Sequence, residues 1–191
     1  MRARCCRSLS NNLWLAVTCL CVLLPVGLLG GCNRTQQERK PLPPVAIQAG
    51  DECHVCGMII ANFPGPKGEA YVRGADKPFK FCSTRDLFSW WLQPENKLAA
   101  TTVYVHDMGA TDWVHPADSA FVDARSAWYV IDQRRKGAMG PTLASFHRQE
   151  DAEAFARRYG GRVVRFQDIT LEMLADLKDG DRHGVGNPPR H

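Results

Sequence analysis

The chain has 191 residues, with 24 lysines and arginines against 20 aspartates and glutamates, and a formal net charge of +4. Three of the arginines fall within the first twelve residues; without this segment, 21 basic residues face 20 acidic ones and the net charge is +1. This near-balance excludes the basic field that nucleic-acid binding requires, so we expect no nucleic-acid partner.

The N-terminus has the organisation of a bacterial lipoprotein signal. A basic start is followed by the apolar run Leu13 to Leu29, which is broken near its end by Pro25 and Gly27. These are the n-region and h-region of a signal peptide. The run ends in LLGGC, which matches the lipobox, whose cysteine is diacylated before cleavage makes it the new N-terminus. We therefore predict a signal peptide over residues 1–31 and a lipidated Cys32.

The alternative for this segment is an uncleaved transmembrane anchor. Its apolar run is at the short limit of the ~17 to 25 residues that a spanning helix needs, so the lipoprotein is favoured. We expect a lipid-anchored protein of the bacterial envelope that faces the periplasm. Asn33 after the lipidated cysteine favours the outer membrane by the known sorting preference. Export also excludes cytosolic roles such as DNA-binding zinc fingers.

Few cysteines remain in the mature domain. Of the eight in the chain, four lie in the signal and Cys32 takes the lipid, which leaves Cys53, Cys56 and Cys82. An odd set of three cannot form a complete disulfide framework.

Two flanking segments read as unstructured. Residues 32–50 are polar and charged and then rich in proline, which predicts a flexible tether. Residues 179–191 contain glycine and proline and almost nothing apolar, so we expect a disordered tail. His183 and His191 lie in that tail, where a solvated role is favoured over metal binding.

Two similar segments predict two tandem ββαβ units. Strand, turn, strand and helix follow one another from Tyr71 and again from Tyr129, and a further strand follows each helix, TTVYVHDM in the first copy and RVVRFQDI in the second. We expect an α+β fold of two small domains or lobes, with the first unit at residues 51–115 and the second at 116–178. Each helix carries an apolar stripe at helical spacing, with Trp91 and Phe155 expected in the respective cores. The stripes are Leu87, Phe88, Trp91 and Leu92, and Ala152, Phe155, Ala156 and Tyr159.

The second copy is longer than the first between its paired strands, and the extra residues fall around RRKGAMGP. Met139 lies there between Ala138 and Gly140. Methionine is usually core filler, but a methionine in a glycine-flanked loop lacks the neighbours that filler needs. We therefore favour a functional thioether.

The stretch CHVCGM places Cys53 and Cys56 three residues apart and Met58 two residues further on. A thioredoxin-type pair would begin a helix after a strand, whereas this pair follows a proline-rich segment. Zinc would want four ligands, and only Cys82 and scattered histidines could complete such a set. A thioether suits soft Cu(I) better than zinc, so two thiolates with one or two thioethers favour Cu(I). The histidines are His54, His106, His115 and His147.

Taken together, the lipobox, the short tether, CHVCGM, the two ββαβ units, MGP and DAEAFARRYGGRVVRFQDI resemble the NosL family over Asp51 to about Ile169. The resemblance implies a Cu(I) chaperone that helps to load the catalytic copper-sulfur centre of nitrous oxide reductase. It also implies a pair of small domains related to those of organomercurial lyase. Cys53, Cys56 and Met58 fall on the family's cysteine motif, and Met139 falls on its later methionine.

Cys82 has no place in the family pattern as we know it. It is either a buried small hydrophobe, as free cysteines often are, or a third thiolate near the metal, and we favour the first.

The resulting hypothesis is a non-enzymatic metallochaperone that binds Cu(I), with zinc as a secondary metal. Its expected partners are nitrous oxide reductase and the machinery that assembles it, and its contact with the membrane is through lipid. Two alternatives stay open: a thiol-disulfide oxidoreductase that uses Cys53 and Cys56, and a structural zinc module that mediates interactions.

Overall fold

The computed structural model describes residues 40–177. The predicted signal peptide, the predicted lipid site at Cys32 and the predicted disordered tail all lie outside these residues. No helix in the described part is both long and apolar enough to span a membrane. Its helices, 3-10 turns and strands are, in chain order, η2 (Ile60–Asn62), β1 (Gly68–Val72), β2 (Phe79–Phe81), α2 (Thr84–Trp91), α3 (Pro94–Ala99), β3 (Ala100–His106), η3 (Asp118–Ala120), β4 (Phe121–Asp123), β5 (Trp128–Ile131), β6 (Lys136–Gly137), β7 (Gly140–Pro141), β8 (Ala144–Phe146), α4 (Gln149–Tyr159), β9 (Arg162–Arg165), η4 (Phe166–Asp168) and α5 (Leu171–Ala175).

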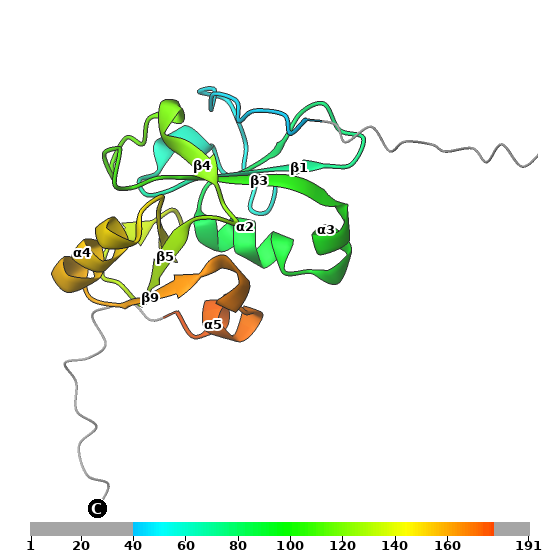
Figure 1. The fold of residues 1–191 in the computed structure, drawn as a ribbon. Coiled ribbons are helices and arrows are strands. Elements are labelled where there is room, and N and C mark those ends of the chain that lie inside the picture. The colour runs from blue at the N-terminus through cyan, green and yellow to red at the C-terminus, as the bar shows by residue number, and fades with distance from the viewer. Residues whose placement is uncertain (1–39, 178–191) are drawn as a thin grey trace, which may run out of the picture. The chain divides into compact units, whose positions relative to one another are not determined.

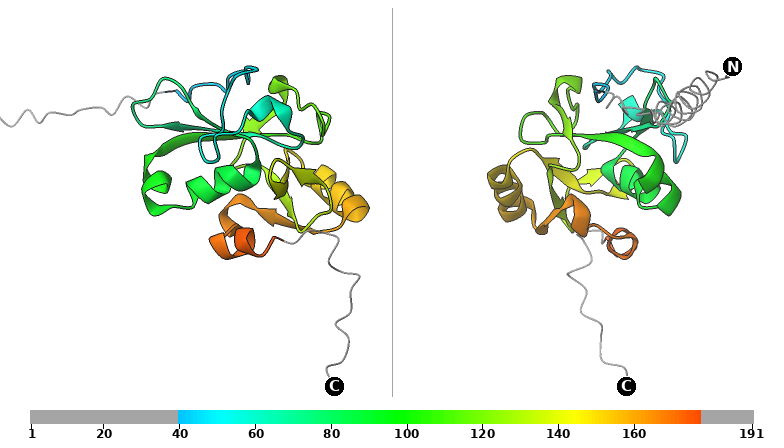
Figure 2. Two further views of the ribbon diagram at one scale, coloured as in Figure 1. Left: turned by 180° about the vertical axis from the view of Figure 1, so that it is seen from behind. Right: turned by 45° about the vertical axis from the view of Figure 1, so that its right-hand side comes forward.

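Two antiparallel sheets share one topology. The first has the strand order β2-β1-β3-β4 and the second β8-β5-β9. In both, the first strand is central, the second lies on one side, and the strand after the helix lies on the other. The expected α+β class is confirmed, and the extra residues of the second copy form the β6–β7 hairpin. Figure 1 shows α2 beneath the first sheet, and the views in Figure 2 keep α3 and α4 at opposite ends of the folded part.

The division between the two copies differs from the predicted boundary at residues 115 and 116. Strand β4, which the sequence assigned to the second unit, pairs with β3 and completes the first sheet. The core is also shared, because Phe88 of α2 packs edge-on against Tyr129 of β5, with ring centroids 5.1 Å apart. The described residues 41–177 accordingly form one compact unit.

Helix α2 forms where the sequence supplies a cap and an apolar face. The Ser83 hydroxyl accepts a hydrogen bond from the backbone N–H of Asp86 and so satisfies a free donor of the first turn. Leu87 and Phe88 point into the core and are fully buried. A Cβ at Gly68 of β1 would lie 2.7 Å from Leu87 Cδ2, so glycine permits this close approach of strand and helix.

The outer face of the first sheet is covered by residues 41–48, which the sequence assigned to the tether. The hydroxyls of Tyr71 and Tyr104 donate to backbone carbonyls of this segment, each at 2.8 Å. The backbone N–H of Val45 donates to the carboxylate of Glu69 at 3.0 Å. The strands β1 and β3 therefore have both faces covered, and the part of the tether closest to the domain is bound to it.

Helix α4 packs against the second sheet. Phe155 stacks on Trp113 and contacts Phe146, with centroids 5.6 and 5.1 Å apart. Both Phe155 and Trp91, the two expected core aromatics, are half-buried and lie at the edges of two different apolar clusters. The helix ends at Gly160, whose φ of 77° suits glycine.

Candidate metal centre

Four potential metal ligands come together beside the first turn of α2. The sulfurs of Cys53, Cys56 and Cys82 and a carboxylate oxygen of Asp86 all lie within 4.8 Å of one another. Cys53 and Cys82 are buried, and Cys56 is half-buried at the edge of the group. We call these four residues the thiol cluster.

The first two thiols are held by a tight loop. Glu52 and Ile59 form an antiparallel bridge, the N–H of Cys53 donates to Met58 O, and the N–H of Gly57 donates back to Cys53 O. Gly57 has a φ of 71°, a conformation that glycine adopts without steric cost. The backbone of the loop, not the packing of its side chains, therefore fixes the spacing of its two sulfurs.

The other two ligands come from the junction between β2 and α2. Cys82 precedes the N-cap, Ser83, and Asp86 lies one turn further along, so that the two ligands face the same side of the chain. The Cys82 thiol donates to Asp86 Oδ2 at 3.2 Å, and Cys53 Sγ lies 3.5 Å from the same oxygen. Cys56 Sγ contacts Cys82 Sγ at 3.5 Å.

The three cysteines differ in acidity. A hydrogen bond from the Cys82 thiol lowers the pKa of Cys53 to about 5; burial opposes this effect, and backbone N–H groups of Cys82, Cys56 and Val55 assist it. The neighbouring Cys53 thiolate, burial and Asp86 all raise the pKa of Cys82. Burial raises the pKa of Cys56. Cys53 is therefore the most acidic of the three thiols and Cys82 the least acidic, so Cys53 is the first to ionise.

A buried cation lies near the cluster. Lys67 is 3% exposed, and its ammonium donates to the backbone carbonyls of Phe63 and Pro64. It precedes Gly68, which pairs with Phe81, so its backbone runs alongside Cys82. Burial lowers the pKa of Lys67 to about 8.

The two predicted methionine ligands occupy different environments. Met58 is half-buried and closes the cysteine loop through its backbone carbonyl. Met139 lies at the tip of the β6–β7 hairpin, with a φ of 62° and 57% of its surface exposed. The hairpin continues into Thr142, whose hydroxyl hydrogen-bonds to that of Thr84 at the start of α2. Their roles as ligands stay predictions.

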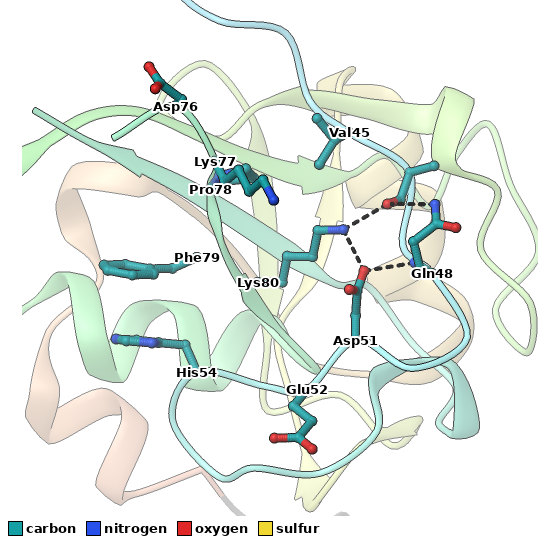
Figure 3. A pocket seen from close by; sticks show the side chains of 11 residues that line it. Val45, Gln48, Asp51, Glu52, His54, Asp76, Lys77, Pro78, Phe79 and Lys80 are labelled. Carbon is teal, nitrogen blue, oxygen red and sulfur yellow. Dashed lines mark hydrogen bonds and ion pairs between the residues drawn. The ribbon is translucent and has the colours of Figure 1, made fainter. Parts of the chain in front are cut away.

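No histidine joins the thiol cluster within residues 40–177. His54 follows Cys53 directly, but its ring turns outward and stacks on Phe79 at 3.9 Å. Both rings line one side of an open pocket of about 530 Å³, and Lys80 and Asp51 form an ion pair on the other side (Figure 3). None of the three thiols lines this pocket.

Two members of the cluster were not among the predicted ligands: for Cys82 a buried hydrophobe was favoured over a third thiolate, and Asp86 was not considered. Cys82 is fully buried, as a small hydrophobe would be, yet its thiol contacts both Cys56 and Asp86. Asp86 was missed entirely, although the i, i+4 spacing from Cys82 and the capping pattern S-x-x-D were readable in CSTRD.

The ligand set suits a thiophilic ion. Thiolate sulfur selects Cu(I) among the soft metals, and Cu(I) needs no complete tetrahedron. Three sulfurs and one carboxylate oxygen also satisfy the four-ligand preference of zinc. The contact between Cys56 and Cys82 would also allow a disulfide, but between a different pair of thiols from the Cys53–Cys56 pair of the oxidoreductase alternative.

Comparison with known proteins gives a consistent result. The sequence profile of the NosL family matches residues 44–174. The chain is 49% identical over 171 residues to the copper-binding lipoprotein NosL of Stutzerimonas stutzeri, covering 88% of each chain. It is 35% identical over 156 residues to the protein of the same name from Achromobacter cycloclastes, covering 80% of each. The crystal structure of the copper chaperone NosL from Shewanella denitrificans matches with a TM-score of 0.68 and 50% identity, covering 70% of this chain and 99% of that one.

Fold and site together define a small α+β protein with a ligand cluster suited to a thiophilic metal ion. Within that class the chain belongs to the NosL family, which confirms the resemblance read from its motifs.

Proposed function

We propose that this protein is a Cu(I) chaperone of the bacterial envelope, and the observation that carries the proposal is the thiol cluster. It brings three thiols, of which Cys53 has a lowered pKa, and a carboxylate within 4.8 Å of one another. Copper is here the cargo, which the chain binds and gives up without chemical change, so no enzymatic activity is proposed.

The unequal exposure of the ligands suits the transfer of a copper ion to a partner protein. Cys53 supplies the buried anionic ligand, and the half-buried Cys56 offers a second sulfur nearer the surface. Met139, exposed on its hairpin, supplies a neutral thioether that a recipient's ligand can displace. Exchange of one ligand at a time would then pass the ion outward without releasing free Cu(I).

The names of the relatives support the cargo, since those proteins are described as copper-binding and as a copper chaperone. We further propose that the recipient is nitrous oxide reductase, reached through the machinery that assembles its copper-sulfur centre. Lipid on Cys32 would hold the chaperone at the periplasmic face of the envelope, in the outer membrane by its Asn33.

Titration of the reduced protein against a chromophoric Cu(I) chelator tests the proposal. We expect about one Cu(I) per monomer, bound through thiolates that must be deprotonated, and a large loss of affinity in Cys53→Ala. The matched control for the alanine variant is Cys53→Ser. A competition with zinc tests the second alternative: zinc affinity above Cu(I) affinity in wild type would support the zinc module instead. Only incidental Cu(I) affinity, together with rapid disulfide exchange on a test substrate, would establish the oxidoreductase.

A further inference from the structure

The two sequence halves of the folded part carry opposite charge. Residues 41–123, which include the first sheet, contain six lysines and arginines against ten aspartates and glutamates. Residues 124–166, which include the second sheet, contain nine against four, and residues 167–177 add three acidic residues and no basic one. The near-neutral total therefore conceals a basic stretch of sequence between residues 124 and 166.

Three of the basic residues gather at the C-terminal end of α4. The guanidinium carbons of Arg135 and Arg158 lie 5.3 and 5.1 Å from the centre of the Tyr159 ring. Arg134 donates through Nη2 to the backbone carbonyl of Arg158, which is one of the free carbonyls of the last helical turn. We call Arg134, Arg135 and Arg158 the arginine cluster.

The arginine cluster is not neutralised internally. Within residues 40–177, the ion pairs of other arginines are those of Arg148 with Asp151, Arg157 with Glu153 and Arg162 with Asp132. No ion pair to a carboxylate of the described part forms at any of the three clustered arginines. Three guanidiniums at the surface without such partners favour an acidic group from outside.

An apolar groove adjoins the arginine cluster. Arg135 covers the ring of Trp113 at 4.7 Å, and both line a groove of about 360 Å³ together with Val114, which is half exposed. Arginine, tryptophan and exposed aliphatic side chains around a groove are typical of a protein-binding surface, where a few such residues dominate the affinity. The remaining lining residues are Ala61, Asn62, Phe63, Pro64, His115 and Lys136.

The same surface continues into the hairpin that carries Met139. The indole N–H of Trp113 donates to Lys136 O, and the N–H of Gly65 donates to Trp113 O, which fastens the base of the hairpin to the rim of the groove. Met139 lies two residues from that base and is 57% exposed. A partner seated over the groove and the arginines would therefore reach the methionine.

We propose that this face, formed by the arginine cluster, the groove and the Met139 hairpin, docks the copper recipient through an acidic surface on that protein. The inference rests on the proposed function, because it identifies the partner of the same site. A protein partner fits better than an anionic membrane because the charges surround a concave aromatic groove. A membrane seated there would also cover the methionine that must meet the recipient.

The arginine cluster would act when the chaperone and the recipient first meet. Opposite charges steer two proteins together and raise association rates by about 10 to 10³-fold. Removing them should slow copper delivery while the thiol cluster, which contains none of these residues, keeps its affinity.

The test compares two double charge reversals with the same change in net charge. Arg134→Glu/Arg158→Glu alters the arginine cluster, and Arg73→Glu/Lys77→Glu alters exposed residues on the β1–β2 turn of the other half. Each variant, as the full lipidated chain, replaces the wild type in cells that make nitrous oxide reductase. The readouts are the rate at which newly made reductase acquires copper and the Cu(I) affinity of the purified chaperone.

We expect copper acquisition to fall by about tenfold or more in the arginine variant only, the size of effect expected from lost steering, with Cu(I) affinity unchanged in both. Wild-type rates in the arginine variant, or equal losses in both variants, would overturn the docking face. Loss of Cu(I) affinity in the arginine variant would also overturn the proposal. The exception is a milder variant, Arg134→Gln/Arg158→Gln, that binds Cu(I) like wild type and still delivers copper slowly.

Two further outcomes distinguish failure of the proposed function from failure of the docking face alone. If the wild-type protein does not bind Cu(I), the proposed function fails and the inference fails with it. If the soluble domain sediments with phosphatidylglycerol vesicles and the arginine variant does not, the face binds lipid and a protein partner is excluded.

Discussion

Among the individual residues, the cysteines of the thiol cluster are chemically distinct although they touch. The hydrogen bond from Cys82 lowers the pKa of Cys53, whereas the neighbouring Cys53 and Asp86 raise the pKa of Cys82. A reduced site of this kind has one readily ionised ligand and can recruit the others by releasing protons as metal enters.

Replacing Cys82 tests this coupling. In Cys82→Ala the donor to Cys53 is lost, so the pKa of Cys53 should rise from about 5 toward that of an ordinary thiol. Alkylation of Cys53 by iodoacetamide at pH 6, followed by mass spectrometry, should slow by about tenfold or more. Cys82→Ser keeps a donor and is the matched control; equal rates in the alanine variant and wild type would contradict the coupling.

Replacing Met139 tests its predicted role as a ligand. The φ of 62° makes a β-branched substitute strained, so leucine is the appropriate apolar replacement. Met139→Leu should weaken Cu(I) binding without changing its pH dependence, because a thioether has no proton to lose. Met173→Leu, at a half-buried methionine of α5, is the control. Chelator competition across pH measures both, and wild-type affinity in Met139→Leu would remove Met139 from the ligand set.

On the scale of elements, the segment 41–48 is a strap laid across the outer face of the first sheet. It seals Glu69, which is fully buried and has one carboxylate oxygen without a partner in the described part. Burial raises the pKa of Glu69 to about 7, with the charges of Lys80, Asp51 and Asp118 as smaller influences. The titrating hydroxyls of Tyr71 and Tyr104 also face this carboxyl.

The pH dependence of stability should show this buried acid. Its folded pKa of about 7 exceeds the model-peptide value of 4.5, so the folded state binds the proton more tightly. The free energy of unfolding therefore falls as pH rises through this window. Glu69→Gln should gain stability over wild type by roughly 3 kcal/mol between pH 4.5 and 7.5.

Urea denaturation of wild type and variant at each pH measures the difference. Direct comparison is needed because the buried His106, with its pKa lowered to about 3 by burial, acts in the opposite sense over part of the range. Tyr104→Phe, which removes one strap hydrogen bond, should differ from wild type by the same amount at both ends of the range. A pH-independent difference in Glu69→Gln would show that Glu69 is ionised in the folded protein throughout.

For the whole molecule, the two repeated units behave as one body because their cores meet at α2. Phe88 contacts Tyr129 of the second sheet, and Phe166 after β9, with centroids 5.1 and 5.2 Å apart. Two separate small domains would each bury little apolar surface and be marginal alone.

The shared core predicts one unfolding transition. Tryptophan fluorescence and far-ultraviolet circular dichroism should give coincident curves in urea. Phe88→Ala should lower the free energy of unfolding by about 3 to 5 kcal/mol and shift both signals together. Leu98→Ala, at a side chain that is 79% exposed, is the control and should cost less than about 0.5 kcal/mol. Two separated unfolding transitions would show that the two lobes unfold independently.

The local elements could be predicted because each has a signal within a few residues. Ser83 and Asp86 mark the start of α2, Gly160 and Gly161 mark the end of α4, and the continuous apolar run Trp128–Ile131 marks a strand. The pair Cys53 and Cys56 was visible for the same reason, since one short loop holds both thiols.

The rest depended on residues far apart in the chain. Cys53 meets Asp86 across 33 positions and Cys56 meets Cys82 across 26. Periodicity tells which side of an element is buried, but not which distant loop covers it. The sequence alone therefore determined the strands and helices of the two ββαβ repeats, the family and half of the thiol cluster. Packing of the cysteine loop on the β2–α2 junction decided the other half, and folding of the basic half brought the arginines together around Tyr159.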